Sequence, residues 1–599
     1  MQDFKKLLYF LDSREKSRAF LLVFLIFIGA FLETVSIGLF FPFVALVNDP
    51  AMIESSQKLN ALYKFSRVSS PSSFLIFLGL GMVGVILFKG LYLGFLSEIQ
   101  ARFLVNRQLS FERRILGAYL RSPYLFFLNN SPVELTRKVR TAQSVIISVV
   151  MPLLLVLSEI SVLTVVMVML FVVQPWLTLG SIAFLGSLTA GLYFLVRRRT
   201  REIGEQQAFH DKQLAKWLEQ TFSGIKEIKV LGCENFFSES VLRHSDGFCH
   251  ASRVSYTISQ FPRLFLETLA TAGLTLYVLS VLLSGRDPRT IIPSLALFAV
   301  AAFRLMPSFN RIVNGLIAAR QYIPRINDVY NDMQTLEGAR LTGQSAFVKE
   351  PRRKSPWTIS KGIEYQNVTH RYPGERGTSL EGLSLSILCG QSVAFVGQSG
   401  AGKSTAVDAL LGLLPIEQGK ILVDGMNIAE CLEDWQSQIG YIPQTIYLSD
   451  DTIRKNIAFG VRDQEVSEEQ IWRALKDAQL DEFVRSLPNG LETEVGDRGV
   501  RLSGGQRQRI GIARALYFDP KVLVLDEATS ALDNDTEKAV IHAIERLRGK
   551  KTIIVIAHRL STVARCDQLY FFQKGRLITQ GTYQDLVAQH ADFRRFAAV

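Results

Sequence analysis

The stretch that decides the fold of this chain is G-Q-S-G-A-G-K-S-T, residues Gly397–Thr405. It follows the apolar run Val393–Val396 and leads into the helix-compatible segment Ala406–Leu414, so a buried strand, a glycine-rich turn and a helix are expected in that order. Such a turn directs several backbone N–H groups and the positive end of a helix dipole toward one point, which suits a polyphosphate. The pattern therefore predicts an α/β domain of the P-loop NTPase class.

We predict that this loop holds the phosphates of ATP together with Mg²⁺. Gly397, Gly400 and Gly402 let the backbone approach an anion closely. Lys403 has the length to reach the β and γ phosphates, and the Ser404 hydroxyl is suited to ligate Mg²⁺. The predicted ATP-binding residues of the loop are Gly397, Gln398, Ser399, Gly400, Ala401, Gly402, Lys403, Ser404 and Thr405.

A second predicted strand ends in two acidic residues. Val522–Leu525 has the pattern of a buried strand, and Asp526 and Glu527 follow it. We expect Asp526 to hold the water shell of Mg²⁺ and Glu527 to orient or deprotonate the attacking water. Between the two strands lies L-S-G-G-Q, residues Leu502–Gln506, followed by an arginine-rich segment of helical character.

With these motifs in this order, residues 357–599 resemble the nucleotide-binding domain of an ABC transporter. The resemblance implies that Tyr372 stacks on adenine and that Gln444 contacts both Mg²⁺ and the membrane domain. It also implies a catalytic role for His558, as the switch histidine at the γ-phosphate. Asp533 matches the loop that follows the catalytic glutamate in this family.

The same resemblance implies that one chain forms only half of a working assembly. In this family each nucleotide lies between the glycine-rich loop of one ATPase domain and the L-S-G-G-Q of a second domain. Because the chain carries one copy of each motif, we expect a homodimer with two competent sites. The residues expected to complete the partner's site are Leu502, Ser503, Gly504, Gly505, Gln506 and Asp533.

The first half of the chain has the composition of a membrane domain. Hydrophobic residues make up 48% of the sequence, and their excess lies in six apolar stretches that reach the roughly 20 residues needed to cross a bilayer. Basic residues flank these stretches, which predicts cytoplasmic loops and an all-α domain of six spans. The stretches are about Ala19–Val47, Phe74–Leu96, Val145–Val173, Trp176–Val196, Thr257–Leu283 and Ile291–Ile312.

The net charge of +12 follows from these flanking residues and does not indicate a nucleic-acid partner. The five cysteines lack paired or metal-like spacing, so we expect them to be reduced and structural. The first apolar stretch is preceded by the charged segment Lys5–Arg18 and is too long for a cleavable signal peptide. We therefore expect a multi-pass protein embedded in membrane lipids, with its ATPase domain in the cytoplasm.

We expect a transmembrane domain over residues 1–321, a linker over 322–356 and an ABC ATPase domain over 357–599. Resemblance to ABC exporters places coupling helices around residues 122–128 and 225–230, which we expect to seat on the ATPase domain near Gln444. The external segment 48–72 is compatible with a short helix at the membrane surface or with a plain connecting loop.

Charged residues within the apolar stretches bear on the cargo, because such residues usually face a cavity or a partner. They are Glu33, Lys89, Glu159, Arg263, Glu267 and Arg304. Lys89, Arg263 and Arg304 lie on spans two, five and six, so we predict that they meet an anionic headgroup such as a phosphate or pyrophosphate. Pairing of Arg263 with Glu267 at helical spacing, or snorkelling to the interface, is the alternative.

Three segments, residues 33–46, 262–267 and 301–312, resemble those of bacterial flippases for lipid-linked oligosaccharides, the group that serves protein N-glycosylation. The resemblance implies a protein of the bacterial inner membrane that moves a polyprenyl-pyrophosphate-linked oligosaccharide from the cytoplasmic to the outer leaflet. A lipid A, phospholipid or multidrug ABC exporter is the main alternative. A soluble ABC ATPase acting on DNA or ribosomes is a rival of another class, which six genuine spans would exclude.

Overall fold

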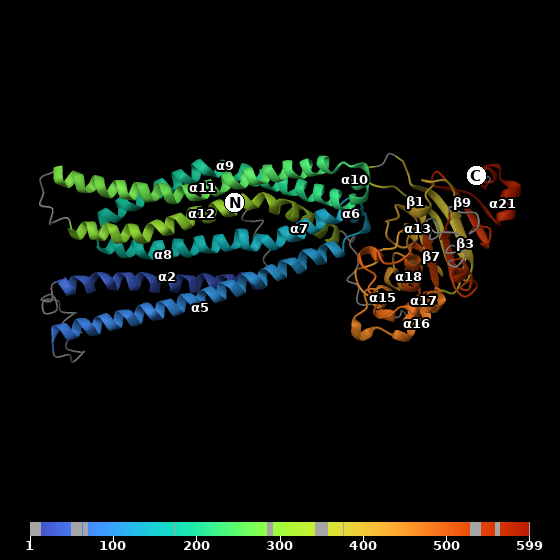
Figure 1. The fold of residues 1–599 in the computed structure, drawn as a ribbon, viewed down its shortest axis with the longest axis horizontal. Helices are drawn as coiled ribbons and strands as arrows, with labels where there is room; N and C mark the ends of the chain where they lie inside the picture. The colour runs from blue at the N-terminus through green and yellow to red at the C-terminus, as the bar shows by residue number, and fades with distance from the viewer. Residues whose placement is uncertain are drawn as a thin grey trace. The chain divides into compact units, whose positions relative to one another are not determined.

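The computed structural model describes residues 13–48, 63, 70–173, 175–283, 292–341, 357–374, 377–526, 541–557 and 563–597. The chain divides into two compact units. The first, the helical unit, comprises Met1–Ser122 and Phe127–Ala346; the second, the sheet unit, comprises Pro123–Phe126 and Phe347–Val599. Figure 1 shows long helices in the first unit and strands with short helices in the second.

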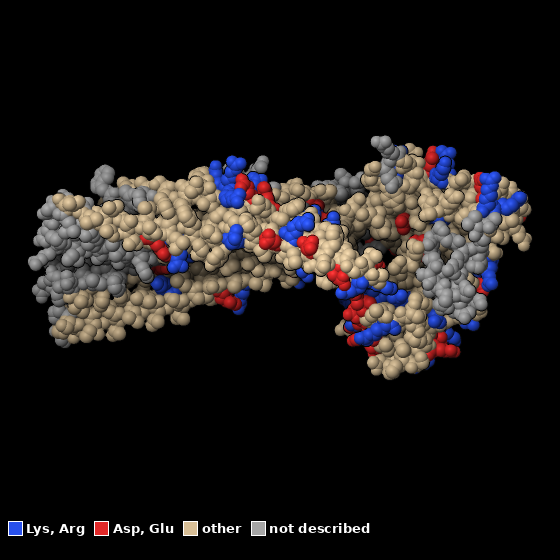
Figure 2. All heavy atoms as spheres, turned by 45° about the horizontal axis from the view of Figure 1, so that its top comes forward, with Lys and Arg blue, Asp and Glu red and all other residues tan. Residues whose placement is uncertain are grey.

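Long helices carry all six predicted spans. They are α2 (Ser13–Asn48), α5 (Pro71–Leu120), α8 (Met151–Val173), α9 (Pro175–Ser223), α11 (Glu234–Leu283) and α12 (Ile292–Leu341), with α7 (Pro132–Val145) and the π-helix η1 (Ile146–Val150) leading into α8. Three helical stretches of the described residues are long and apolar enough to cross a membrane by length and composition, namely Ser17–Ser36, Ser72–Leu120 and Pro132–Val168. In Figure 2 much of the described surface of the helical unit is neither acidic nor basic, as a lipid-facing surface requires.

Local signals set the ends of these helices. Ser70 is the N-cap of α5 and accepts a hydrogen bond from the backbone N–H of Ser73, and Pro71 occupies the first helical turn. The 49 residues of α9 correspond to about 73 Å, so this helix is far longer than a bilayer core of roughly 30 Å. This length agrees with the long polar segment that follows the fourth apolar stretch in the sequence.

Short helices occupy the two turns at which coupling helices are predicted. These are α6 (Tyr124–Leu128) and α10 (Ile225–Leu231). Gly232 ends α10 with a φ of 63°, the left-handed conformation that closes many helices. The helical character of both turns is confirmed, while their seating on the ATPase domain stays a prediction. The external segment 48–72 lies mostly outside the described residues.

The linker expected at residues 322–356 begins later than the sequence suggested. Helix α12 continues to Leu341 and its last part belongs to the helical unit. The reason is packing, because one face of this segment is buried against neighbouring helices at a spacing of three to four residues. The buried residues are Ile326, Val329, Met333 and Leu336.

The sheet unit contains two sheets. The antiparallel sheet has the order β2-β1-β4-β5, and the mainly parallel sheet has the order β10-β9-β3-β8-β7-β6 with only the β9–β10 pair antiparallel. The strands are β1 (Gly362–His370), β2 (Leu380–Leu388), β3 (Ser392–Val396), β4 (Gln418–Val423), β5 (Met426–Asn427), β6 (Ile439–Ile442), β7 (Val522–Asp526), β8 (Thr552–Ile556), β9 (Gln568–Gln573) and β10 (Arg576–Gly581). The helices are α13 (Lys403–Leu410), α14 (Leu432–Ser437), α15 (Ile453–Ile457), α16 (Glu468–Asp477), α17 (Asp481–Ser486), α18 (Gly504–Leu516), α21 (Tyr583–Gln589) and α22 (Ala591–Ala597).

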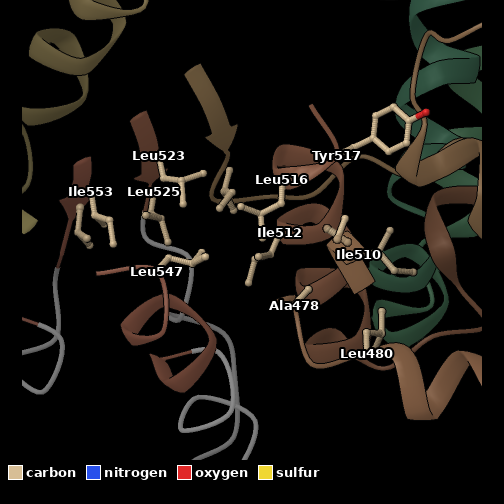
Figure 3. Packing of buried hydrophobic residues seen from close by; sticks show 14 of the residues in the cluster. Ala478, Leu480, Ile510, Ile512, Leu516, Tyr517, Leu523, Leu525, Leu547 and Ile553 are labelled. Atoms are coloured by element: carbon tan, nitrogen blue, oxygen red, sulfur yellow. The ribbon is translucent and has the colours of Figure 1, made fainter. Parts of the chain in front are cut away.

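Both faces of the parallel sheet are buried, which explains why its strands read as continuous apolar runs. On one face Leu523 and Leu525 of β7 and Ile553 of β8 pack with residues of α18 such as Ile512, as Figure 3 shows. Alternate residues of the same strands, such as Val524, join a second core on the opposite face. The sheet is therefore a rigid support for whatever its edge carries.

Candidate functional site

The predicted nucleotide-binding residues gather at one edge of the parallel sheet. Strands β3, β8, β7 and β6 are neighbours and run parallel, so their carboxyl ends meet on the same side. The glycine-rich loop follows β3, Asp526 ends β7, and Gln444 follows β6 by two residues. The carboxyl edge of a parallel sheet is where α/β proteins usually bind ligands.

The glycine-rich loop has a strained backbone that a side chain would disturb. Gly397 has a φ of 152°, and a Cβ at this position would lie 2.3 Å from the carbonyl oxygen of Phe572. Gly402 has a φ of 99° and serves as the N-cap of α13. A substituted residue would therefore either clash or adopt a costly conformation.

Lys403 is held inside the loop by hydrogen bonds to the loop's own backbone. Its side chain is buried, and its Nζ donates to the carbonyl oxygens of Gly397 at 2.8 Å and Gln398 at 2.9 Å. Ser404, by contrast, is exposed at the start of α13. An ammonium group fixed in this position and an accessible hydroxyl beside it suit a phosphate chain and its metal ion.

Two side chains from other elements anchor the helix that follows the loop. The Tyr365 hydroxyl of β1 donates to the carbonyl of Ala406 at 3.0 Å. The Trp435 indole N–H of α14 donates to the carbonyl of Leu410 at 2.7 Å. These bonds satisfy backbone acceptors of α13 and fix its direction relative to the antiparallel sheet.

Asp526 lies in a small acidic cluster that the sequence analysis missed. The Tyr441 hydroxyl of β6 is hydrogen-bonded to Asp526, and Asp408 of α13 lies close enough to feel its charge. Burial and, next, repulsion by Asp526 raise the pKa of Asp408 to about 6. The signal in the sequence was a lone acidic residue within the apolar segment that follows the loop.

The L-S-G-G-Q motif forms the N-terminus of α18. The Ser503 hydroxyl accepts from the backbone N–H of Gln506 at 3.2 Å, while the Gln506 side chain accepts from the N–H of Ser503 at 2.9 Å. This reciprocal capping box leaves Ser503 and Gly504 exposed and the helix dipole directed outward. The motif is therefore arranged to receive an anion.

Helix α18 also binds the segment that follows Gln444. The contact is made by Arg514, which the sequence analysis did not single out. Arg514 donates from Nη1 to the carbonyl of Tyr447 at 2.7 Å and from Nε to the carbonyl of Asn456 at 2.7 Å. Its guanidinium also lies over the Phe459 ring, 4.6 Å from the centroid. Burial lowers the pKa of Arg514. The L-S-G-G-Q helix and the Gln444 segment are thus joined by one side chain.

Some of the remaining predicted site residues lie within the described part of the chain and others do not. Tyr372 lies just beyond β1 and packs edge-on against the His370 ring, with centroids 5.0 Å apart. Glu527, Asp533 and His558 lie outside the described residues. The residues present fit a Mg²⁺–nucleotide, because the fixed Lys403 ammonium, the exposed Ser404 hydroxyl and the carboxylate of Asp526 supply the cationic and oxygen groups that it requires. ATP binding at this edge, with Ser404, Gln444 and Asp526 at Mg²⁺, stays a prediction.

The structure does not show the three predicted headgroup residues, Lys89, Arg263 and Arg304, gathered into one cluster. Arg263 pairs with Glu267 through Nε at 2.8 Å, which is the alternative that the helical spacing suggested. Lys89 is half-buried on α5, and no ion pair joins it to another described residue. Arg304 lies on α12, with its side chain outside the described part of the structure.

Glu159, one of the charged residues noted within the apolar stretches, has partners that the sequence analysis did not single out. Glu159 of α8 is buried and accepts from the Ser308 hydroxyl at 2.6 Å and from Nε of Arg311 at 2.6 Å. Arg311 and Ser308 are both on α12, so the three residues tie two spans together. Arg311 lies near the end of the apolar stretch Ile291–Ile312 and was not among the charged residues singled out there.

Comparisons with known proteins place these features in a family. A family model described as the ABC transporter transmembrane region matches residues 19–306, and one described as ABC transporter matches residues 380–530. The fold resembles a solved bacterial Atm1-family ABC exporter with ATP bound, with a TM-score of 0.77 and 23% identity over 98% of this chain and 99% of that chain.

Curated relatives extend over nearly the whole chain. An ATP-dependent lipid A-core flippase of Xylella fastidiosa is 31% identical over 575 residues, covering 94% of this chain and 91% of the relative. The flippase of the same name from Salmonella typhimurium is 29% identical over 86% of this chain and 87% of its own length. The flippase of that name from Cupriavidus metallidurans is 30% identical over 85% of this chain and 84% of its own length.

Proposed function

Since this chain belongs to the ABC transporter family, we propose that it is an ATP-driven flippase that moves a phosphorylated glycolipid from the cytoplasmic to the outer leaflet of a bacterial inner membrane. The chain is an ABC exporter half-transporter, with a transmembrane region fused to an ATPase domain that couples ATP hydrolysis to transport. The observation that carries the proposal is the extended similarity to flippases of lipid A-core.

The ATPase cycle is proposed to need two copies of the chain. Ser503 and Gly504 begin α18 with their polar groups exposed, and within one copy they cap only their own helix. In a homodimer they would meet the γ-phosphate of ATP held by the partner's Lys403 loop. ATP then favours the closed pair of ATPase domains by its differential affinity, and hydrolysis removes that preference.

Hydrolysis is assigned to residues next to the described edge. Mg²⁺, when bound, would neutralise charge on the phosphates. Glu527 follows Asp526 directly and is proposed to orient or deprotonate the attacking water, while His558, which follows β8 by two residues, is proposed to sense the γ-phosphate. Tyr372 is proposed as the adenine-stacking side chain. Replacing Glu527 by Gln should leave ATP binding intact and stall turnover; turnover at the parental rate would remove Glu527 from this role.

Two phosphorylated glycolipids are candidates for the cargo. The relatives favour a lipid A-core amphiphile, whose phosphates are anionic. The segments around Glu33, Arg263 and Arg304 favour a polyprenyl-pyrophosphate-linked oligosaccharide, by their resemblance to flippases of that lipid. Both cargoes would present phosphate to the basic residues Lys89, Arg263 and Arg304, and we propose that these residues recognise that shared group.

The test is ATPase stimulation and leaflet transfer by the full chain in proteoliposomes. Lipid A-core, a polyprenyl-pyrophosphate-linked oligosaccharide and an uncharged hydrophobic drug are added separately. We expect stimulation by a phosphorylated glycolipid and its loss in the double variant Arg263→Ala with Arg304→Ala. Arg102→Ala removes an exposed arginine outside the spans and is the control. Stimulation by the drug alone, or unchanged transfer of the glycolipid by the double variant, would overturn the proposal.

A further inference from the structure

Two histidines face each other across the α9–α11 helix pair, away from the nucleotide-binding edge and from the predicted headgroup residues. Nδ1 of His210 on α9 lies 3.3 Å from Nδ1 of His244 on α11. Both rings are half-buried. The two nitrogens are within hydrogen-bonding distance, the tautomers decide which ring donates, and at 3.3 Å the bond is a long one.

The distance between the two Nδ1 atoms also matches that of two nitrogens that coordinate one metal ion. When two imidazole nitrogens bind one tetrahedral Zn²⁺ at about 2.0–2.1 Å each, they lie about 3.3–3.4 Å apart. The pair therefore already has the separation that shared metal coordination requires. Neutral imidazole is a preferred ligand of Zn²⁺, Cu²⁺ and Ni²⁺.

The surroundings hold the His210 ring in this position. Gly247 lies on the same helix as His244, one turn further on, and a Cβ added there would fall 2.4 Å from Cε1 of His210. Only glycine leaves the notch in which the ring lies. Phe209 packs edge-on against both rings, with centroids 5.3 Å from His210 and 6.2 Å from His244. One turn away, Gln207 donates to Ser252 at 3.1 Å and sets the register of the two helices.

The electrostatics favour a neutral His244 ring. Burial, followed by the charges of His210 and Arg243, lowers the pKa of His244. A ring that is neutral near pH 7 has a free electron pair for a metal ion. Among the described residues no group of three or more His, Cys, Asp or Glu side chains forms a metal site, so water would complete the coordination.

We propose that His210 and His244 form a two-histidine site for a divalent transition metal ion of the Zn²⁺ class, which ties α9 to α11. The two helices are joined by α10, and the histidines lie about 15–20 Å along each helix from that turn. A metal ion at this place would stiffen the hairpin that carries the predicted second coupling helix. The site depends on the geometry of these two helices and not on the proposed cargo.

The test uses the full chain in detergent, without a polyhistidine tag, and Cu²⁺ as the spectroscopic probe, because Cu²⁺ binds such ligands more tightly than Zn²⁺ does. Electron paramagnetic resonance should show one Cu²⁺ with coupling to two imidazole nitrogens. His210→Ala and His244→Ala should each lose that signal. His250→Ala removes an exposed histidine of the same helix and should keep it.

Gly247→Ala gives an independent arm, because it keeps both ligands and displaces only the His210 ring. We expect it to weaken Cu²⁺ binding, and Zn²⁺ to raise the melting temperature of the parent but not of His210→Ala. A two-nitrogen signal that persists in His210→Ala, or a parent that shows coupling to a single nitrogen, would overturn the proposal. Each variant is checked for ATPase activity without added transition metal, so that misfolding is recognised separately.

Discussion

The helical unit and the sheet unit use apolar side chains in opposite ways. In the sheet unit they fill cores on both faces of the parallel sheet, and the polar groups of the site lie at its edge. In the helical unit the apolar window of Ser72–Leu120 is only 6% buried. Helices there are joined by polar ties such as Glu159 with Arg311 and Lys138 with Asp332. The contribution of an apolar or a charged side chain to stability therefore depends on whether the surrounding solvent is lipid or water.

The largest expected effect is at the site edge of the sheet unit. Lys403→Ala removes the ammonium that the loop holds in place, so ATP turnover should fall by roughly 10²–10³-fold, as for the loss of other preorganised charge-stabilising groups. Steady-state ATPase rates of the full chain measure this. Lys420→Ala, an exposed lysine on β4, is the matched control. A Lys403→Ala rate within about twofold of the parent would contradict the assignment.

The next comparison replaces one leucine in each unit. Leu523 of β7 is 1% exposed within the core shown in Figure 3, so Leu523→Ala should lower the free energy of unfolding by about 2–5 kcal/mol. Leu91 of α5 is 77% exposed on a membrane span, and Leu91→Ala should change it by less than about 1 kcal/mol because no cavity forms. Thermal unfolding in detergent micelles compares them. Equal losses in the two variants would erase the contrast between the units.

A third comparison sets a buried ion pair against an exposed one. Lys138 of α7 is 7% exposed and donates to Asp332 of α12 at 2.7 Å, and Tyr119 of α5 donates to the same carboxylate. Lys138→Met leaves the carboxylate with one partner fewer and should cost about 3 kcal/mol. Arg102→Met breaks the exposed pair with Glu98 and should cost under about 1 kcal/mol.

The double variant Lys138→Met with Asp332→Leu sharpens this result. Because both charges are removed together, much of the lost stability should return. Unfolding of the four chains, followed by circular dichroism, supplies the numbers for a double-mutant cycle. A double variant that is less stable than Lys138→Met alone would mean that the residues do not act as a pair.

The smallest expected effect is a pH dependence within the sheet unit. The pKa of Asp408 is raised to about 6, so this carboxyl stabilises the fold when protonated, and that contribution is lost as pH rises from about 4 through 6. Asp408→Asn should therefore be more stable than the parent at pH 7, by about 1 kcal/mol after allowing for solvent screening, and no more stable at pH 4. Unfolding without nucleotide at both pH values measures this. Asp450→Asn, an exposed control, should show no such difference.

Motifs and apolar runs were enough to predict the class of both units. The stretch Gly397–Thr405 follows β3 and its last three residues open α13, and long helices carry the six predicted spans. Patterns with short sequence spacing are predictable because each residue's neighbours are local. The hydrogen bonds from Tyr441 to Asp526 and from Arg514 to the Tyr447 carbonyl were not predictable, because they join elements that lie far apart in the chain.

The boundary at Tyr322 shows the same limit. Mixed charge suggested a linker there, yet Val329 and Met333 are buried because α12 packs on other helices. Likewise, helical spacing left open whether Arg263 is free or paired, and the rotamers of α11 bring it to Glu267. Packing decided the first case, whereas the Arg263–Glu267 pair is exposed and local to one turn of α11.

The sequence by itself determined the glycine-rich strand–loop–helix motif, the long apolar helices and the family, since these depend on residue type and on spacing along one element. Only the tertiary structure decided which side chains from different helices and strands meet, as Glu159 with Arg311 and His210 with His244 do. The physical reason is that a contact of about 3 Å depends on the packing of two whole elements, which no local pattern encodes.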